Sequence, residues 1–323
     1  MIKITPISKF TKSLALKYDY LPYMIQRYLD FLGEKQTLAM LEANEKPLIP
    51  SLRVNTLKIS INKLVEKLEN NGFSLKKVKH LPYGFRIIKA PKNIGSTHEF
   101  LYGFYYLQKI ASMFPPFILN PSPEDLVIDM CASPGSKSTQ LAQMMKNKGT
   151  LVVVEKNKNR IDALEMNIRR MGVKNSIIMN FDAINLGSLN LKADKILLDA
   201  PCTGEGLIRE DRTRKKSRNF SDIITMASIQ KQLLQSGVRN LKKKGQLIYS
   251  TCSIAPEENE LVIDEILSDF PSVSIQKLNT QYGVSGFTEY NNEKLNPDLK
   301  FSQRFFPHIH DTIGFFLCLL QKN

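Results

Sequence analysis

The sequence predicts an α/β protein with a doubly wound parallel sheet over residues 121–323, preceded by a smaller helical and α+β region over residues 1–120. Three observations indicate this. After residue 120, short apolar runs alternate regularly with segments of helical periodicity, as in repeated βα units. Before residue 120, helices and strands are mixed without that alternation. A chain of 323 residues can also hold two units and a sizeable core.

The charge is the unusual feature of the composition. Lys and Arg number 45 against 31 for Asp and Glu, a net charge of +14. A polyanionic partner explains this excess, and nucleic acid is favoured over a membrane surface because no basic amphipathic anchor is evident. A basic proteome would give the same excess without any partner. No apolar run is long enough to span a bilayer, and Met1-Ile2-Lys3 does not open a signal peptide.

The cysteines indicate a reducing compartment. There are four, without the C-x-x-C pairing of metal sites, so no metal is expected. In a chain of this size four cysteines do not make a disulfide scaffold. We therefore expect a cytoplasmic protein. The cysteines are Cys131, Cys202, Cys252 and Cys318.

The first 120 residues are predicted to form a small basic unit beside short helices. The expected elements are two short helices within 19–45 that meet at Gly33, a strand over 52–55, a helix capped by Ser60 and ended by Gly72, a strand over 85–88, and a helix over 99–113 ended by Pro115 and Pro116. This unit contains seven of the basic residues against only two acidic ones, Glu66 and Glu69, which favours a nucleic-acid platform over a solvated basic face. The seven basic residues are Arg53, Lys58, Lys63, Lys67, Lys76, Lys77 and Lys79.

The next unit opens with a strand, a small-residue turn and a helix between Asp125 and Met145. A helix N-terminus after a strand directs backbone N–H groups toward a ligand. Gly135 permits close approach, and Pro134 fixes the turn. The turn is neither G-x-G-x-x-G nor G-x-x-x-x-G-K-[ST], which argues against dinucleotide and P-loop sites.

The remaining βα units follow in order. They are a strand over 150–154 ending at Glu155, a helix over 161–171 stopped by Gly172, a strand over 176–180 ending near Asp182, a strand over 195–198 ending at Asp199, a helix near 222–242, a strand over 246–250 followed by Cys252, and a closing edge strand over 313–320.

Acidic residues and thiols cluster after these strands, at the edge where open α/β sheets bind ligands. Glu155 suits the hydroxyls of a ribose and Asp182 an adenine amino group, although a single acid there is commonly a helix cap. With Asp129 and Asp199 they favour an adenosine-containing cofactor. The absence of a pyrophosphate-cradling glycine pattern favours one without phosphates, and S-adenosylmethionine fits.

Two thiols follow neighbouring strands, so Cys202 and Cys252 are expected in one crevice with Asp199. A cysteine at the ligand edge is a nucleophile candidate, whereas Cys318 reads as an inert core residue. Thiol, carboxylate and methyl donor together describe methylation of a pyrimidine at carbon 5.

The sequence resembles the NOL1/NOP2/Sun (RsmB-type) family of RNA cytosine-5 methyltransferases. The resemblance rests on D-M-C-A-S-P-G-S-K, D-A-P-C-T-G-E-G and Y-S-T-C-S-I-A-P-E-E-N-E, with the flanking segments L-R-V-N-T and H-D-T-I-G-F-F, and covers roughly residues 50–320. It implies a Rossmann-like class I methyltransferase sheet. It also implies S-adenosylmethionine as the cofactor and RNA as the partner.

The resemblance implies a role for each matching residue. Glu155, supported by Arg160, would bind the ribose, Asp182 would face the adenine, and Asp199 would contact the base and stabilise the adduct. Cys252 would be the nucleophile and Cys202 would assist release, forming the catalytic set with Asp199 and Lys137. The methionine end would lie against Cys131, Ala132, Ser133, Pro134, Gly135, Ser136 and Lys137.

A basic loop within residues 209–218 lies between the two thiol-bearing strands, which favours contact with RNA phosphates over a solvated loop. Glu210-Asp211-Arg212 departs from relatives that often carry a proline, without touching a catalytic position. The basic residues are Arg209, Arg212, Arg214, Lys215, Lys216 and Arg218.

The resulting hypothesis is an RNA cytosine-5 methyltransferase of the archaeal tRNA type, acting through a covalent cysteine–carbon 6 adduct. The same chemistry on rRNA is one alternative. A catalytically silent RNA-binding assembly factor is another, against which the retention of both thiols, Asp199 and Lys137 argues. A membrane is not expected as a partner, and a monomer is compatible with the sequence.

Overall fold

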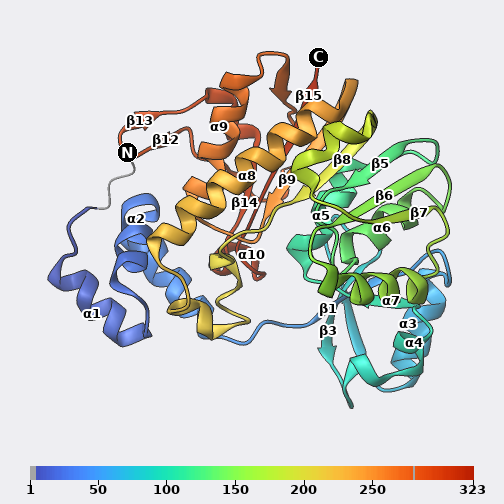
Figure 1. The fold of residues 1–323 in the computed structure, drawn as a ribbon. Coiled ribbons are helices and arrows are strands. Elements are labelled where there is room, and N and C mark those ends of the chain that lie inside the picture. The colour runs from blue at the N-terminus through green and yellow to red at the C-terminus, as the bar shows by residue number, and fades with distance from the viewer. Residues whose placement is uncertain (1–4, 279–280) are drawn as a thin grey trace.

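A nine-stranded sheet forms the centre of the computed structural model, which describes residues 5–278 and 281–323 (Figure 1). Its strand order is β11-β14-β15-β9-β8-β5-β6-β7, and β10 pairs with β15. Strands β5 to β9 pair in parallel, as the sequence predicts for a doubly wound sheet. The strands are β5 (Leu126–Asp129), β6 (Thr150–Glu155), β7 (Ser176–Asn180), β8 (Ala193–Asp199), β9 (Leu241–Thr251), β10 (Val273–Ile275), β11 (Val284–Ser285), β14 (Gln303–Phe305) and β15 (Phe315–Lys322).

Helices cover both faces of this sheet because alternate strand residues are apolar on each side. On one face, residues such as Val153 and Leu197 pack beneath α5, α6 and α7. On the other, Val152 and Leu198 pack beneath α8 and α9, and α8 crosses the sheet in Figure 1. These helices are α5 (Ile110–Leu119), α6 (Ser136–Met144), α7 (Ile161–Met171), α8 (Phe220–Asn240) and α9 (Glu260–Asp269).

The strand predicted over residues 313–320 is present as β15, but the prediction that it closes the sheet at its edge is wrong. Strand β15 lies inside the sheet, antiparallel to β9 on one side and to β14 on the other. Its side chains reach both core layers, with Phe316 and Cys318 on one face and Leu317 on the other. The strands beyond it, β14 and β11, span only three and two residues, too short for periodicity to reveal.

A separate four-stranded antiparallel sheet, in the order β2-β3-β1-β4, carries α3 on one side. The predicted cap is confirmed, since the Ser60 hydroxyl accepts a hydrogen bond from the backbone N–H of Lys63. Leu64 and Leu68 of α3 are fully buried against the sheet. These elements are β1 (Ser51–Val54), α3 (Ile61–Asn70), β2 (Ser74–Lys77), β3 (Gly84–Lys89) and β4 (Tyr105–Leu107).

The predicted helix over 99–113 is wrong. A short helix, α4 (His98–Leu101), ends near Gly103, which adopts φ +71°. After β4, helix α5 contains Pro115 and Pro116 instead of stopping at them. The carbonyl of Ser112, which Pro116 leaves without its helical donor, accepts a hydrogen bond from the Gln108 side chain at 3.0 Å. Helix α5 precedes residue 120 but packs on the large sheet. The division of the chain near residue 120 therefore remains a prediction.

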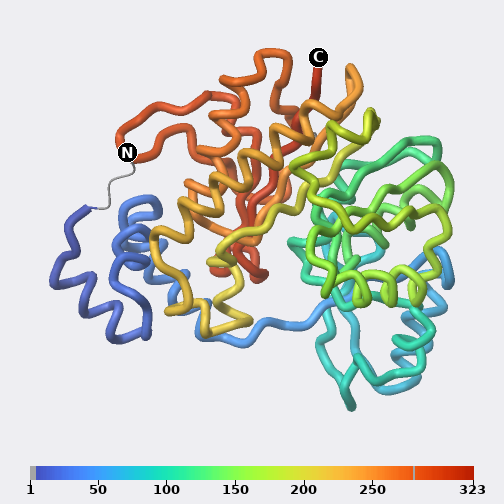
Figure 2. The backbone as a smooth tube through the Cα atoms, in the orientation of Figure 1, coloured from blue at the N-terminus to red at the C-terminus, as the bar shows by residue number. Residues whose placement is uncertain are grey.

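The first helices lie apart from the small sheet. Helix α1 (Lys9–Tyr18) was not predicted, and α2 (Pro22–Asn44) is interrupted at Gly33, where the two predicted helices meet. Figure 2 shows the chain running from these helices to the small sheet through an extended connection. Helices α1 and α2 share a core with Ile208, Ile254 and Phe306 of the large unit.

Smaller elements complete the described chain. Within residues 5–278 and 281–323, no helix combines the length and apolarity needed to cross a membrane. The remaining strands and helix are β12 (Glu289–Tyr290), β13 (Glu293–Lys294) and α10 (Pro307–His310).

Candidate active site

A cavity of about 650 Å³ opens at the carboxyl edge of the large sheet. The strand ends of β5, β6, β8 and β9 and the segment after β7 meet there, as the parallel topology requires. The structure therefore brings together the predicted residues from separate motifs. The cavity is lined, among others, by Cys131, Glu155, Asp182, Asp199, Cys202 and Cys252.

Two carboxylates stand at one end of this cavity. Glu155 accepts a hydrogen bond from the backbone N–H of Asn157 at 2.8 Å. Burial acts to raise the pKa of Asp182, but hydrogen bonds from the Lys156 ammonium and the Ile184 N–H outweigh it, so that the pKa is lowered. Asp182 is therefore ionised at neutral pH, ready to accept hydrogen bonds.

Arg160 links Glu155 to the turn after β5. Its Nη1 lies 3.5 Å from Glu155 Oε2, and its Nη2 donates to the Ser133 carbonyl at 2.6 Å. In return, the Ser133 hydroxyl donates to the Arg160 carbonyl at 3.0 Å. Arg160 therefore joins the turn after β5 to the segment after β6 and contacts Glu155. Its support of ribose binding remains a prediction.

Only part of the predicted cofactor turn faces the cavity. Cys131 and Ser133 line it, whereas Ala132, Pro134, Gly135, Ser136 and Lys137 do not. Gly135 adopts φ +98°, which requires glycine for conformational reasons. A Cβ at this position would meet the Leu164 side chain at 3.1 Å, so the close neighbour is α7.

Asp199 is held at both carboxylate oxygens. Lys137 Nζ donates to Oδ2 at 2.6 Å, and the Ser250 hydroxyl donates to Oδ1 at 2.8 Å. Lys137 is buried, whereas the Asp199 side chain is about one-third exposed to the cavity. The two donors therefore fix the orientation of the Asp199 carboxylate, which lines the same cavity as the two thiols.

The two predicted thiols meet. Cys202 and Cys252 follow the paired strands β8 and β9, and their Sγ atoms are 3.0 Å apart. Both cysteines are free. Hydrogen bonding to Cys252, together with burial, raises the pKa of the Cys202 thiol well above its ordinary value. Cys202 is therefore a protonated thiol beside Cys252 at neutral pH, a donor positioned next to a possible nucleophile.

Glu258 fixes the two thiol-bearing loops relative to each other. Its carboxylate accepts hydrogen bonds from the N–H and hydroxyl of Thr203, at 2.9 and 2.5 Å, and from the Ser253 hydroxyl at 2.6 Å. These residues directly follow Cys202 and Cys252. Glu258 is fully buried, and burial raises its pKa despite the hydrogen bonds it accepts.

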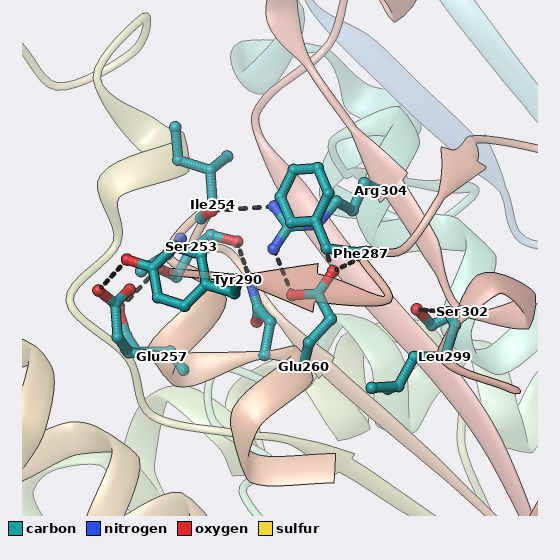
Figure 3. A network of polar contacts seen from close by, with 12 residues as sticks. Ser253, Ile254, Glu257, Glu260, Phe287, Tyr290, Leu299, Ser302 and Arg304 are labelled. Carbon is teal, nitrogen blue, oxygen red and sulfur yellow. Dashed lines mark hydrogen bonds and ion pairs between the residues drawn. The ribbon is translucent and has the colours of Figure 1, made fainter. Parts of the chain in front are cut away.

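The buried Arg27 of α2 links the same two loops through ion pairs. Its Nη1 lies 2.7 Å from Glu205, which follows β8, and its Nη2 lies 2.5 Å from Glu257, which follows β9. Tyr290 also donates to Glu257, at 2.7 Å, as Figure 3 shows. All three charged side chains are at most 2% exposed.

A second buried ion pair lies beside this one. Figure 3 shows Arg304 on β14 directed toward Glu260 at the start of α9, with Nε donating at 2.5 Å. The same guanidinium donates to the Ile254 carbonyl at 2.9 Å. The acidic run after Cys252 therefore contributes internal anchors to the site.

Sequence reasoning missed these supporting residues. Arg27, Glu258 and Ser250 received no role in the predicted site. The run Glu257-Glu258-Asn259-Glu260 entered only as part of the resemblance. For Arg27, the available signal was a charged residue among the apolar positions of the first helix predicted within residues 19–45.

The prediction that the loop over 209–218 contacts RNA phosphates is wrong for its buried members. Arg209 pairs with Asp311 at 2.8 Å, and Lys215 pairs with Glu45 at 2.5 Å; both side chains are less than a tenth exposed. Arg214 donates to the Thr203 carbonyl and lines the cavity. The loop therefore ties α1 and α2 to the site.

Two of the predicted platform cations are also used internally. Arg53 is fully buried and donates to the Ser136 carbonyl at 2.7 Å and to the Thr139 hydroxyl at 2.8 Å. Lys58 donates to the carbonyls of Tyr102 and Arg170. These contacts join the small sheet to α6 and α7. Burial removes Arg53 from any RNA-facing surface, whereas Lys58 remains exposed.

Asp129 gives the site a pH-dependent stability. Burial raises its pKa to about 7, and its carboxylate accepts a hydrogen bond from Ser138. A folded pKa above the unfolded value favours the folded state below about pH 4, and this contribution is lost as the pH rises through 7. We expect Asp129→Asn to remove up to about 4 kcal/mol of pH dependence between pH 4 and 8.

Urea unfolding at several pH values measures this effect. The matched control is Asp162→Asn, on an exposed position at the start of α7. It should leave the pH profile of the unfolding free energy unchanged. If the profile of Asp129→Asn matches wild type, Asp129 does not titrate in this range.

Comparison with known proteins finds similarity over nearly the whole chain. The family model described as 16S rRNA methyltransferase RsmB/F matches residues 116–321, and that for the N-terminal domain of 16S rRNA methyltransferase RsmF matches residues 21–110. Over 98% of this chain, the 25S rRNA (cytosine-C(5))-methyltransferase nop2 of Schizosaccharomyces pombe is 33% identical, and the Homo sapiens 28S rRNA (cytosine(4447)-C(5))-methyltransferase is 35% identical.

A crystal structure of a methyltransferase homologue from Pyrococcus horikoshii is similar throughout. It is 39% identical, with a TM-score of 0.90 over 98% of this chain and 100% of that chain. By contrast, this chain spans 53% of the length of the Schizosaccharomyces pombe relative and 39% of the human one.

Proposed function

Because the chain belongs to the 16S rRNA methyltransferase RsmB/F family, we propose that it transfers a methyl group from S-adenosylmethionine to carbon 5 of a cytosine in RNA. The observation that carries the proposal is the Sγ–Sγ separation of 3.0 Å between Cys202 and Cys252, in one cavity with Asp199. Methylation at this carbon needs a nucleophile, a group that supports the base, and a group that assists release.

The cavity fits the cofactor. Its volume, about 650 Å³, lies within the usual range for small-molecule sites. Glu155 and Asp182 offer carboxylates to ribose hydroxyls and an adenine amino group, and Cys131 and Ser133 offer the wall toward the methionine end. When bound, S-adenosylmethionine supplies an electrophilic methyl group.

The protein residues act on the base. Asp199 contacts the cytosine near N3 and N4 and stabilises the charge that develops there. The Lys137 ammonium and the Ser250 hydroxyl fix its two oxygens, so the carboxylate need not reorganise during the reaction. Cys252 forms the bond to carbon 6, and Cys202 assists the later cleavage of that bond.

The substrate class is proposed from the relatives. The two curated relatives named above act, by their names, on ribosomal RNA. We therefore propose ribosomal RNA as the substrate, in place of the transfer RNA expected from the sequence alone. Transfer RNA is the alternative that mapping decides.

The test uses labelled S-adenosylmethionine with separate ribosomal and transfer RNA fractions from a methylation-deficient source, followed by bisulfite mapping. Incorporation into ribosomal RNA at a single cytosine supports the proposal. Incorporation confined to transfer RNA would reassign the substrate. Binding without incorporation into either fraction would favour a silent assembly factor.

Removal of a cofactor carboxylate should weaken cofactor binding. We expect Glu155→Ala and Asp182→Ala each to reduce affinity for S-adenosylmethionine by about 1–3 kcal/mol, because each change leaves a buried hydrogen-bond partner unmatched. Isothermal titration calorimetry measures the effect, with Asp162→Ala as the exposed control on α7. Unchanged affinity in both variants would refute this placement of the adenosine.

A further inference from the structure

A second groove, of about 640 Å³, lies between the small sheet and the segments that flank β14. One wall comes from β2, the turn after it and β3, with Lys76, Lys77, Lys79 and Arg86. The opposite wall contains Tyr282 and other aromatic residues. We call this feature the lysine groove.

The lysine groove carries unneutralised positive charge. Lys76, Lys77 and Lys79 are exposed, and none forms an ion pair with a carboxylate anywhere in residues 5–278 and 281–323. Arg86 is different, since it pairs with Asp311 at 3.0 Å. Three cations along one wall therefore remain available to an anionic partner, which contrasts with the internally paired loop after β8.

An aromatic side chain, Tyr282, lines the same groove and packs against other rings. The Tyr282 ring centroid lies 5.0 Å from that of Phe114 and 5.4 Å from that of His80. Its ring is only partly buried by these neighbours. A ring held in place with one part exposed is a platform on which an unpaired base stacks at little entropic cost.

Side-chain ion pairs and backbone hydrogen bonds connect the segments that border the lysine groove to the loops that carry the thiols. Asp311 bridges Arg86 of β3 and Arg209 of the loop after β8. Three residues after Asp311, the Gly314 N–H donates to the Gly206 carbonyl at 2.8 Å. The Gly206 N–H in turn donates to the Cys252 carbonyl at 2.9 Å. These contacts fix the segment that borders the groove relative to the loops that carry Cys202 and Cys252.

We propose that the lysine groove binds the single-stranded RNA that flanks the target cytosine, with the three lysines on phosphates and Tyr282 stacked on a base. The inference rests on the proposed function. Aromatic stacking needs an unstacked base, which a paired helix does not offer, so a single strand is the occupant. Phosphate contacts hold the strand without reading its sequence.

The first experiment measures salt-dependent binding of a fluorescein-labelled 12-nucleotide RNA, single-stranded or annealed to its complement. We expect Lys76→Ala/Lys77→Ala/Lys79→Ala to bind the single strand at least about tenfold more weakly. The slope of log affinity against log salt should fall by about 2, since each lost phosphate contact contributes about 0.7.

The matched control removes the same charge elsewhere. Lys148, Lys174 and Lys243 are exposed and precede β6, β7 and the apolar part of β9, at the opposite edge of the sheet. Their triple alanine variant should retain most of the wild-type affinity and salt slope. Equal losses in the two triple variants would overturn the proposal, because net charge alone would then explain binding.

The second experiment tests the stacking position. Tyr282→Ala should weaken binding of the single strand about tenfold, whereas Tyr282→Phe should restore it because the ring is kept. Photocrosslinking of a 4-thiouridine-substituted strand should label the peptides containing Tyr282 or His80. Equal binding by Tyr282→Ala and Tyr282→Phe, with no crosslink there, would contradict the stacking role.

The two proposals fail differently. If wild type methylates RNA but the lysine triple variant binds and methylates it normally, the groove proposal is wrong and the methyltransferase proposal stands. If the lysine triple variant loses binding but wild type transfers no methyl group to any RNA, the groove stands as an RNA site and the enzymatic proposal is wrong.

Discussion

Replacing Cys252 with alanine is expected to abolish both the methylated product and any covalent protein–RNA complex. Carbon 5 of cytosine is too weak a nucleophile to accept a methyl group directly. Attack of a thiolate on carbon 6 converts the ring into an enamine-like nucleophile, so this bond must form first. Radiolabel incorporation and denaturing electrophoresis measure the two losses.

Cys202→Ala is expected to behave in the opposite way and to accumulate a methylated RNA–protein adduct. After methyl transfer, the proton at carbon 5 must leave and the Sγ–carbon 6 bond must break. The Cys202 thiol, 3.0 Å from Cys252, is positioned to donate its proton to the departing Cys252 sulfur, and the Cys202 thiolate that results can accept the proton from carbon 5. Without it, the adduct should survive denaturation and carry the transferred label.

Cys318→Ala is the control for thiol removal. Cys318 is fully buried in the core formed with α8 and α9, away from the cavity, and should form no trapped adduct when replaced. A trapped adduct in Cys252→Ala instead of Cys202→Ala would mean that the two roles are exchanged. Normal turnover in both variants would refute covalent catalysis by these thiols.

The second large effect is expected from Arg27→Met. This change leaves Glu205 and Glu257 buried without their shared cation. Removing one partner of a buried ion pair typically costs about 3–5 kcal/mol of unfolding free energy. Methyl transfer should fall as well, because the same carboxylates belong to the loops that carry Cys202 and Cys252. Urea unfolding and a turnover assay at a permissive temperature separate the two effects.

Arg169→Met is the matched control, since Arg169 forms an exposed i,i+4 pair with Glu165 on α7. Its effect on unfolding free energy should lie below about 1 kcal/mol. The triple variant Arg27→Met/Glu205→Gln/Glu257→Gln removes the uncompensated charges and should recover part of the lost stability. An Arg27→Met protein as stable as the control would show that this network is not a major anchor.

The sequence by itself determined the parallel strands of the large sheet and the edge at which function lies. Strand length and apolar periodicity are local properties, so the runs ending at Glu155 and Asp199 could be predicted without knowing their neighbours. Parallel order then places their carboxyl ends on one edge. For the same reason the meeting of Cys202 and Cys252 was predictable from their positions after adjacent strands.

The helix cap at Ser60 was equally predictable, because a cap involves residues only three apart. Errors arose where tertiary contacts override such local signals. The carbonyl that Pro116 leaves free in α5 is satisfied by Gln108, so the prolines did not end the helix. Strand β15 became an interior strand because two very short strands lie beyond it.

Only the tertiary structure decided which charges are free and which are internal. Arg27 meets Glu205 and Glu257 across 178 and 230 residues of sequence, a distance over which no pattern of spacing carries information. Arg53 and the three groove lysines are all basic residues of the same N-terminal unit, so the sequence alone does not distinguish them. Burial separates them, since an ion inside the protein must be paired or hydrogen-bonded, whereas an exposed one can remain available to RNA.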